Sequence, residues 1–147
     1  YTAVFVPFMI YSIICWRKQT LQSKENEKAL CPTWLSLKAQ GLNLLFLIGI
    51  VAIDSGLLMH YESTIHSGQL MLKLTSGVMI GSSILANFWL IYQKLDAWIW
   101  WVVYSIAGMT LYALIGNAFS FVLFSIFLIV NTGAGVAWIK LRKQNIK

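Results

Sequence analysis

Two tryptophans in the second half of the chain are the residues best suited to bind a small molecule. Trp98 and Trp101 lie three positions apart, so their indole rings share one face of a helix. Two indoles on one face can sandwich a flat heterocycle, and a positively charged ring gains further from their π faces. Ser105 and Tyr112 follow at helical spacing and extend the stripe. An aromatic belt at a membrane interface explains the same tryptophans, and the tryptophans alone favour that alternative.

Two amides and one carboxylate lie deep in apolar stretches. Asn87 and Asn131 either bridge helices or bind the polar groups of a substrate, and the sequence favours neither role over the other. Asp54 is the only carboxylate well within an apolar stretch, and such an acid is a functional candidate by default. Because Asp54 lies about a turn and a half from the end of its stretch, a structural role competes strongly with proton coupling.

The sequence contains no catalytic or metal-binding motif. HExxH, GxSxG, phosphate-binding loop and CxxC patterns are all missing. His60 and His66 lie six positions apart without a carboxylate or thiol cluster beside them. Cys15 and Cys31 fall on the side predicted to be cytoplasmic, where thiols stay reduced. We therefore expect no enzyme, no metal site and no cofactor.

The composition indicates an all-α integral membrane protein. Of the 147 residues, 59% are apolar and only 11% are charged, whereas a soluble domain has about 25% charged residues. This excludes a soluble enzyme, a nucleic-acid-binding module and a disulfide scaffold. Five nearly uncharged stretches approach the roughly 20 residues that cross a bilayer, and without the alternation of a β-barrel they predict helices. The predicted spans are Tyr1 to Trp16, Leu42 to His60, Leu70 to Tyr92, Ala97 to Ile115 and Ala118 to Ile139.

The basic residues predict how the chain is oriented. The loop after the first span and the C-terminal tail are rich in Lys and Arg, whereas the loops on the opposite side contain none. Basic loops stay in the cytoplasm. We expect a multi-pass protein of the inner or plasma membrane with a cytoplasmic C-terminus.

The first and last spans end alike, which predicts parallel repeats. Trp16 and Trp138 each precede basic residues, so both spans have the same orientation. The chain also begins inside an apolar run, so we expect further helices before it. The predicted organisation is the last helix of a first three-helix repeat (1–16), a basic cytoplasmic loop (17–40), a linker helix (41–61), a second three-helix repeat (69–139) and a cytoplasmic tail (140–147). Small residues predict close helix packing at Ser76-Gly77, Gly81-Ser-Ser83, Ala107-Gly108 and Gly133-Ala-Gly135.

These motifs resemble those of a known family. The run Leu95-Asp-Ala-Trp98-Ile-Trp-Trp101, the later Tyr112-Ala-Leu-Ile-Gly116 and the ending at Trp138 are similar to the C-terminal half of PnuC-type transporters. These proteins carry nicotinamide riboside and related vitamins or nucleosides. The resemblance runs from about residue 69 to residue 143, and Ile10-Tyr-Ser-Ile-Ile-Cys-Trp16 resembles the close of the family's first half.

The resemblance implies a fold, a transport mode and a set of site residues. It implies a 3+1+3 arrangement of parallel repeats, similar to the SWEET sugar transporters, a homotrimer, and facilitated diffusion with trapping of the vitamin by phosphorylation. Trp98 and Trp101 would carry the family's WxxW motif, and Ser105 stands where the family often has Asn. We expect a flat-ringed substrate to be bound by Trp98, Trp101, Ser105, Asn87, Asn131 and Tyr112. The alternative is a non-transporting assembly or interaction protein, or a diverged relative with another small-molecule ligand.

Overall fold

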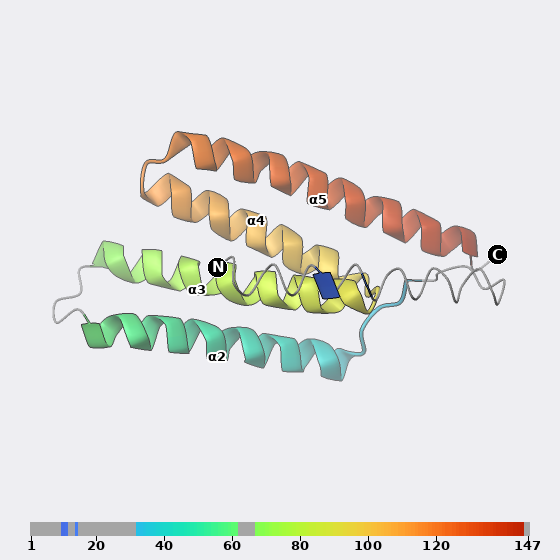
Figure 1. The fold of residues 1–147 in the computed structure, drawn as a ribbon, viewed down its shortest axis with the longest axis horizontal. Coiled ribbons are helices and arrows are strands. Elements are labelled where there is room, and N and C mark those ends of the chain that lie inside the picture. Colours follow the sequence, from blue (N-terminus) through green and yellow to red (C-terminus); the bar gives the residue numbers. More distant parts are fainter. Residues whose placement is uncertain (1–9, 12–13, 15–31, 62–66, 146–147) are drawn as a thin grey trace.

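Four long helices make up the described part of the computed structural model (Figure 1). The structure describes residues 10–11, 14, 32–61 and 67–145. The helices are α2 (Leu37–Tyr61), α3 (Ser67–Ile91), α4 (Asp96–Leu114) and α5 (Ala118–Asn145). By length and composition, all four are able to cross a membrane. The all-helical membrane class is thus confirmed for four spans, while the predicted span 1–16 lies mostly outside the described residues, as do Cys15, Cys31 and His66.

Two helix bounds differ from the prediction for physical reasons. α2 begins at Leu37, inside the predicted loop 17–40, because the Ser36 Oγ accepts a hydrogen bond from the Ala39 N–H at 3.3 Å. Such a cap satisfies a backbone donor that the first turn leaves free. α5 continues past Ile139 to Asn145. Arg142 and Lys143 lie in its last turn, where positive charges interact favourably with the helix dipole.

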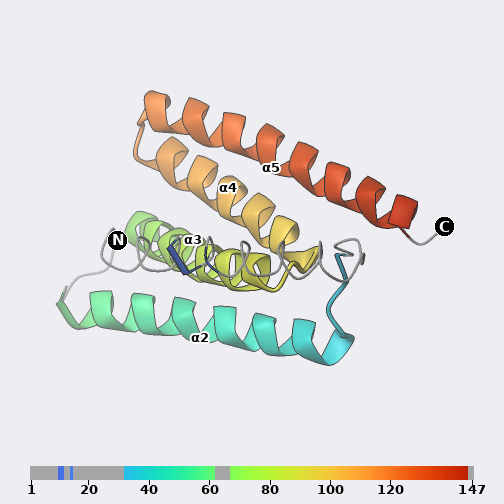
Figure 2. The ribbon, with the colours of Figure 1, turned by 45° about the vertical axis from the view of Figure 1, so that its right-hand side comes forward.

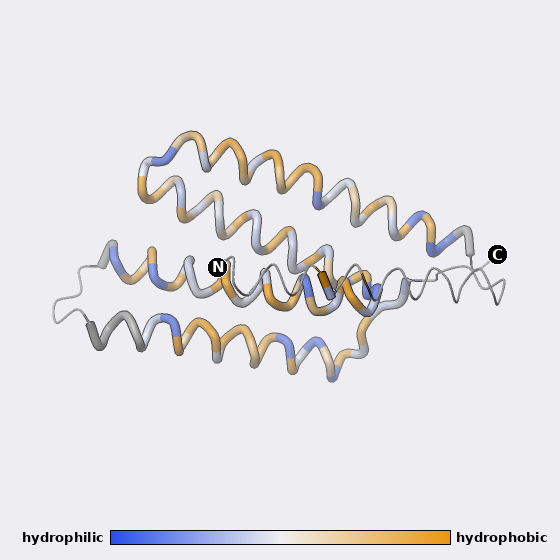
Figure 3. Tube along the Cα trace, in the orientation of Figure 1, coloured by the Kyte–Doolittle hydropathy of each residue, from blue (hydrophilic) through white to orange (hydrophobic). Residues whose placement is uncertain are grey.

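The helices lie side by side in the order of the chain (Figures 1 and 2). α2 packs on α3, α3 on α4 and α4 on α5. Buried side chains gather on α3 and at the start of α4, as Leu85, Ala86 and Leu95 illustrate. The outer helices α2 and α5 are largely apolar (Figure 3). Many of their large apolar side chains are exposed, so these are surfaces for lipid or for further helices.

Small residues set the spacing between neighbouring helices. A Cβ added at Gly77 would lie 3.0 Å from the Cα of Val51, so α2 and α3 approach closely there. Gly108 faces the ring of Phe124 on α5, which leaves no room for a side chain. The predicted close packing is confirmed at these glycines. At Gly133, by contrast, an added Cβ would meet nothing within 4 Å in the described part of the chain.

A tight turn makes α4 and α5 antiparallel. Gly116 has a φ of 70°, a conformation that glycine adopts without the steric cost of a side chain. The Asn117 Oδ1 accepts a hydrogen bond from the Ser120 N–H at 3.0 Å and so caps the start of α5. The first half of α4 therefore lies beside the second half of α5, and both carry residues of the predicted site.

Candidate functional site

A groove of about 250 Å³ runs between α4 and α5. Its α4 wall extends from Leu95 to Val103 and its α5 wall from Asn131 to Ile139. Because the helices are antiparallel, Leu95 and Ile139 lie at one end, and Val103 and Asn131 lie at the other. The lining is mostly aliphatic, with a few polar groups on Trp98, Asn131 and Thr132. Such a mixture of apolar surface and few polar groups is typical of sites for small molecules.

A buried hydroxyl orients the amide of Asn131. The Asn131 Nδ2 donates to the Ser105 Oγ at 3.0 Å and to the Trp101 carbonyl oxygen at 3.4 Å. Ser105 is fully buried, and its Oγ in turn donates to the same carbonyl at 2.8 Å. No hydrogen bond reaches the Asn131 Oδ1 from any residue that the structure describes. This network turns the amide nitrogen toward α4 and leaves the amide oxygen available as an acceptor.

Trp98 forms an aromatic wall of the groove. Its ring packs edge-on against Trp138 of α5, with ring centroids 5.4 Å apart and planes at 73°. Gly135 permits this approach, since a Cβ added there would lie 3.1 Å from the Trp98 Cβ. The Trp98 Nε1 is buried and has no acceptor within the described part of the chain. An unsatisfied buried donor costs about 1–3 kcal/mol, so a ligand that supplies an acceptor would offset that cost.

The second predicted tryptophan contributes its backbone rather than its ring. The Trp101 ring meets Tyr104 edge-on, with centroids 5.4 Å apart and planes at 87°. Trp101 is not among the residues that line the groove. In this conformation the indoles of Trp98 and Trp101 do not face each other across the groove and cannot sandwich a flat ring.

Tyr112 lies beyond the groove, although it shares a helix face with Trp98. Of the predicted stripe, the side chains of Trp98, Ser105 and Tyr112 contact α5. The Tyr112 ring packs on Phe124 of α5, with centroids 5.3 Å apart. The groove ends on α4 at Val103, so Tyr112 belongs to an aromatic packing seam.

Asn87 lies on α3, which is not one of the two helices that form the groove. Its Nδ2 donates to the Ser83 carbonyl oxygen of α3 at 2.8 Å, and among the described helices α3 packs on α2 and α4 but not on α5. The structure therefore brings together one part of the predicted set, namely Trp98, Ser105, Asn131 and the backbone of Trp101. It leaves Asn87 and Tyr112 apart from them.

The remaining titratable candidates do not reach the groove. Asp54 on α2 is half-buried, and its Oδ2 has no hydrogen-bond partner in the described part of the chain. Among the described helices, α2 packs on α3 alone, so α3 and α4 lie between Asp54 and the α4–α5 groove. Among the described residues, no group of His, Cys, Asp and Glu could hold a metal ion.

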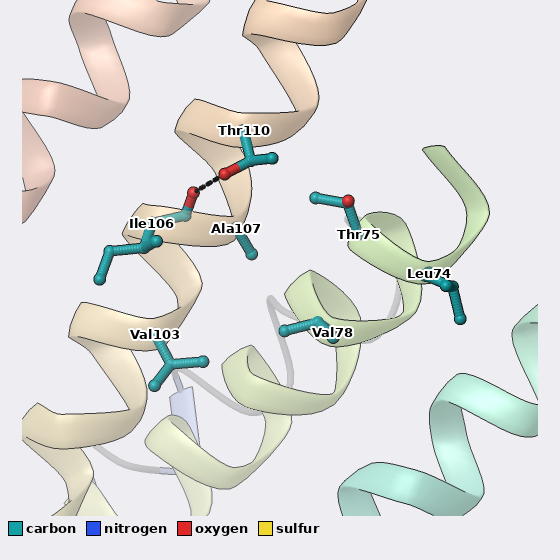
Figure 4. A pocket seen from close by; sticks show the side chains of 7 residues that line it. All are labelled: Leu74, Thr75, Val78, Val103, Ile106, Ala107 and Thr110. Carbon is teal, nitrogen blue, oxygen red and sulfur yellow. Dashed lines mark hydrogen bonds between the residues drawn. The ribbon is translucent and has the colours of Figure 1, made fainter. Parts of the chain in front are cut away.

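A second groove, of about 320 Å³, lies between α3 and α4 (Figure 4). Its lining is aliphatic apart from Thr75 and Thr110, which extend toward it from the two helices. Both hydroxyls donate to carbonyl oxygens of their own helices, Thr75 to Met71 at 2.7 Å and Thr110 to Ile106 at 2.9 Å. This groove therefore offers little to orient a polar ligand.

A short segment before α2, residues 32–36, is tied to the turn between α3 and α4; we call it the strap. Thr33 forms a parallel β-bridge with Lys94. The Leu95 N–H donates to the Thr33 carbonyl oxygen at 3.1 Å, and the Lys94 Nζ donates to the Thr33 Oγ1 at 2.7 Å. The strap therefore has a fixed position at the end of the bundle where α4 begins.

A buried carboxylate binds the strap at the residue that follows Trp34. Asp96, only 3% exposed, accepts hydrogen bonds from the Leu35 N–H at 2.7 Å and from the Gln40 Nε2 at 3.0 Å. Asp96 is also the first residue of α4, where a negative charge interacts favourably with the helix dipole. Trp34, between these anchors, lines the α4–α5 groove.

Sequence reasoning missed two aromatic residues at the site. Trp138 could have been found, because it lies seven positions after Asn131 and so shares its helix face. Trp34 carried no such signal, since its place depends on contacts with residues about sixty positions later in the chain.

Comparison with known protein families agrees with this architecture. A family model described as nicotinamide mononucleotide transporter matches residues 1–140. The chain belongs to this family. The expected PnuC-type identity is thereby confirmed, and with it a membrane transport role. Comparisons with curated proteins and with solved structures gave no match. Membership of a transporter family also favours a role without catalysis.

Proposed function

We propose that this protein carries nicotinamide riboside across the membrane and binds it in the α4–α5 groove. The family membership supports a nicotinamide-containing substrate. The riboside has a flat, positively charged pyridinium ring, and an indole face such as that of Trp98 attracts such a ring.

The observation that carries the proposal is an unused donor and an unused acceptor at one groove. Within the described part of the chain, the Trp98 Nε1 is a buried donor without a partner and the Asn131 Oδ1 accepts no hydrogen bond. A primary carboxamide, the substituent of the nicotinamide ring, offers one acceptor and two donors. Its nitrogen would donate to the Asn131 Oδ1. Its oxygen would accept from the Trp98 N–H once the indole ring turns enough to uncover the buried Nε1.

The charge of the lining favours the riboside over the mononucleotide. Of the described residues that line the groove, none is Lys or Arg. A phosphate is usually recognised by cationic side chains or by helix N-termini, and the α4 N-terminus at one end of the groove already carries the Asp96 carboxylate. The ribose is neutral and needs no cationic side chain, and its hydroxyls can donate to the Thr132 hydroxyl oxygen, which also lines the groove.

The proposed transport mode is facilitated diffusion, with phosphorylation in the cytoplasm trapping the product. Asp54 is distant from the groove, so we propose that no proton is coupled to transport. We further propose the 3+1+3 fold, in which a first three-helix repeat covers the exposed faces of α4 and α5, and a homotrimer in the inner or plasma membrane.

Uptake by proteoliposomes tests this proposal. The full-length protein, reconstituted without any ion gradient, should accumulate labelled nicotinamide riboside only to the outside concentration. Trapping is then tested by sealing a riboside kinase and ATP inside, which should drive accumulation well beyond that level. Asp54→Asn should leave the initial rate within about twofold, since no proton is carried.

Two outcomes would contradict the proposal. Uptake that requires a proton gradient and is lost in Asp54→Asn would refute facilitated diffusion. A folded, reconstituted protein that moves no nicotinamide compound would favour a diverged relative or a non-transporting interaction protein.

A further inference from the structure

We infer that Trp34 is a gate of the α4–α5 groove, held over one end of it by the strap, and that it controls how fast a bound ligand leaves. The inference extends the proposed function, because it concerns the release of the same ligand. It rests on where the strap is anchored, on the place of Trp34 in the lining of the groove and on the exposure of its side chain.

The position of Trp34 is at one end of the groove. The strap is bonded to Leu95 and Asp96, at the start of α4. The groove reaches the same level, where Leu95 and Ile139 line it. Asn131 lies at the opposite end. A ligand held by Trp98 and Asn131 would therefore meet Trp34 if it left past the start of α4.

The backbone of the strap is fixed, whereas the Trp34 side chain is partly free. The residues on either side of Trp34 are hydrogen-bonded, Thr33 to the α3–α4 turn and Leu35 to the Asp96 carboxylate. The Trp34 side chain itself is 42% exposed. The Trp34 ring can therefore rotate about its side-chain bonds and cover or uncover the end of the groove without any helix moving.

The anchor is stronger than an ordinary loop contact. Asp96 is nearly fully buried, and each of its carboxylate oxygens accepts one hydrogen bond from the segment around the start of α2. Hydrogen bonds to a charged acceptor are stronger than those between neutral groups. Loss of this charge should therefore release the strap and with it Trp34. Asp96 is in this sense a positioning residue.

Cysteine accessibility tests the gate without any ligand. Ile139 is half-buried and lines the groove at the end where Trp34 lies, and Thr110 is an exposed residue that lines the separate α3–α4 groove. In full-length protein carrying Cys15→Ser and Cys31→Ser, Ile139 and Thr110 are each replaced in turn by cysteine. Labelling by a charged methanethiosulfonate reagent is followed in nanodiscs, where both faces are accessible. Trp34→Ala and Asp96→Asn should each raise the labelling rate of Ile139→Cys several-fold and leave that of Thr110→Cys unchanged.

Ligand dissociation tests the same gate in the working protein. Labelled nicotinamide riboside is bound and its release is followed after dilution. Trp34→Ala should speed release about fivefold or more, since affinity changes appear mainly in the dissociation rate. Trp34→Phe should restore slow release, because a ring is again present. The melting temperature should stay unchanged in Trp34→Ala, which separates gating from a structural role.

The outcomes separate this inference from the proposed function. If the wild type binds the riboside but Trp34→Ala changes neither release nor labelling at position 139, the gate is refuted and the transporter stands. Trp34 is then a residue of the membrane-interface belt. If no nicotinamide compound binds but labelling still depends on Trp34, the proposed substrate fails and the gate stands.

Discussion

At the scale of single residues, the site depends on a few polar atoms in an apolar groove. Ser105 does not line the groove, yet its hydroxyl orients the Asn131 amide. Trp98 supplies both an aromatic face and a buried N–H that has no acceptor among the described residues. A ligand that satisfies these groups binds by more than apolar contact, which gives the site a means of selecting its substrate.

Replacing Ser105 with alanine tests this orienting role. Without the hydroxyl, the Asn131 amide loses its 3.0 Å contact and keeps only the 3.4 Å one, so its oxygen is less well oriented. One hydrogen bond is worth about 0.5–1.5 kcal/mol, so we expect riboside affinity to fall about two- to tenfold. The matched control is Ser82→Ala, an equally buried serine on α3 that bonds to the Val78 carbonyl oxygen. Equal affinity losses in Ser105→Ala and Ser82→Ala, measured by titration calorimetry, would argue against the role.

The spacing predicts one stripe along α4 that contains Trp98, Trp101, Ser105 and Tyr112. In the structure Trp98, Ser105 and Tyr112 contact α5, whereas the Trp101 ring packs on Tyr104 of α4. The helical periodicity of the sequence could not show which side chains of that stripe pack against α5 and which of them line a groove. That distinction depends on Phe124, which fills the space beside Tyr112, and on Gly135, which leaves space beside Trp98.

At the scale of elements, hydrophobic length predicted the helices well. Uncharged stretches of bilayer length correspond to α2, α3, α4 and α5, with ends shifted by a few residues. The early start of α2 was missed because Lys38 and Gln40 look like loop residues, although Ser36 caps a helix there. The strap was missed as well, because hydrogen bonds between segments about sixty residues apart leave no local pattern.

Two glycine substitutions test the packing of α4 on α5. Gly108→Ala would place a methyl group into the Phe124 ring, so we expect a lower melting temperature in detergent. Overpacking of this kind costs about 1–3 kcal/mol. Gly133→Ala is the control on α5, where an added Cβ meets nothing within 4 Å in the described structure. It should be neutral or raise the melting temperature, since alanine favours a helix by up to about 1 kcal/mol over glycine. Destabilisation of both variants to the same extent would contradict the described interface.

At the scale of the whole molecule, the four described helices form an open row rather than a closed bundle. α2 and α5 each pack on one neighbour within the described part of the chain and expose much apolar surface. Sequence-based charge counting predicts that the end carrying Lys140, Arg142 and Lys143 faces the cytoplasm. The strap and the start of α4 lie at that same end, so the proposed gate would control release into the cell.

A topology assay checks this orientation. A fluorescent protein fused after Lys147 should fold and fluoresce, because the tail is predicted to be cytoplasmic. Alkaline phosphatase fused at the same position should be inactive, since it requires an oxidising compartment. The reverse pattern would overturn the orientation, and would place the gate on the outer side.

The most direct test of the central claim is the affinity of the full-length protein for nicotinamide riboside with and without the groove's aromatic wall. Titration calorimetry would compare the wild type with Trp98→Ala and with Trp100→Ala, a tryptophan close by on α4 that does not line the groove. We predict that Trp98→Ala weakens binding about tenfold or more and that Trp100→Ala leaves it unchanged, because of these two tryptophans Trp98 alone lines the groove. Riboside binding that is unaffected by Trp98→Ala would contradict the claim and place the ligand elsewhere in the molecule.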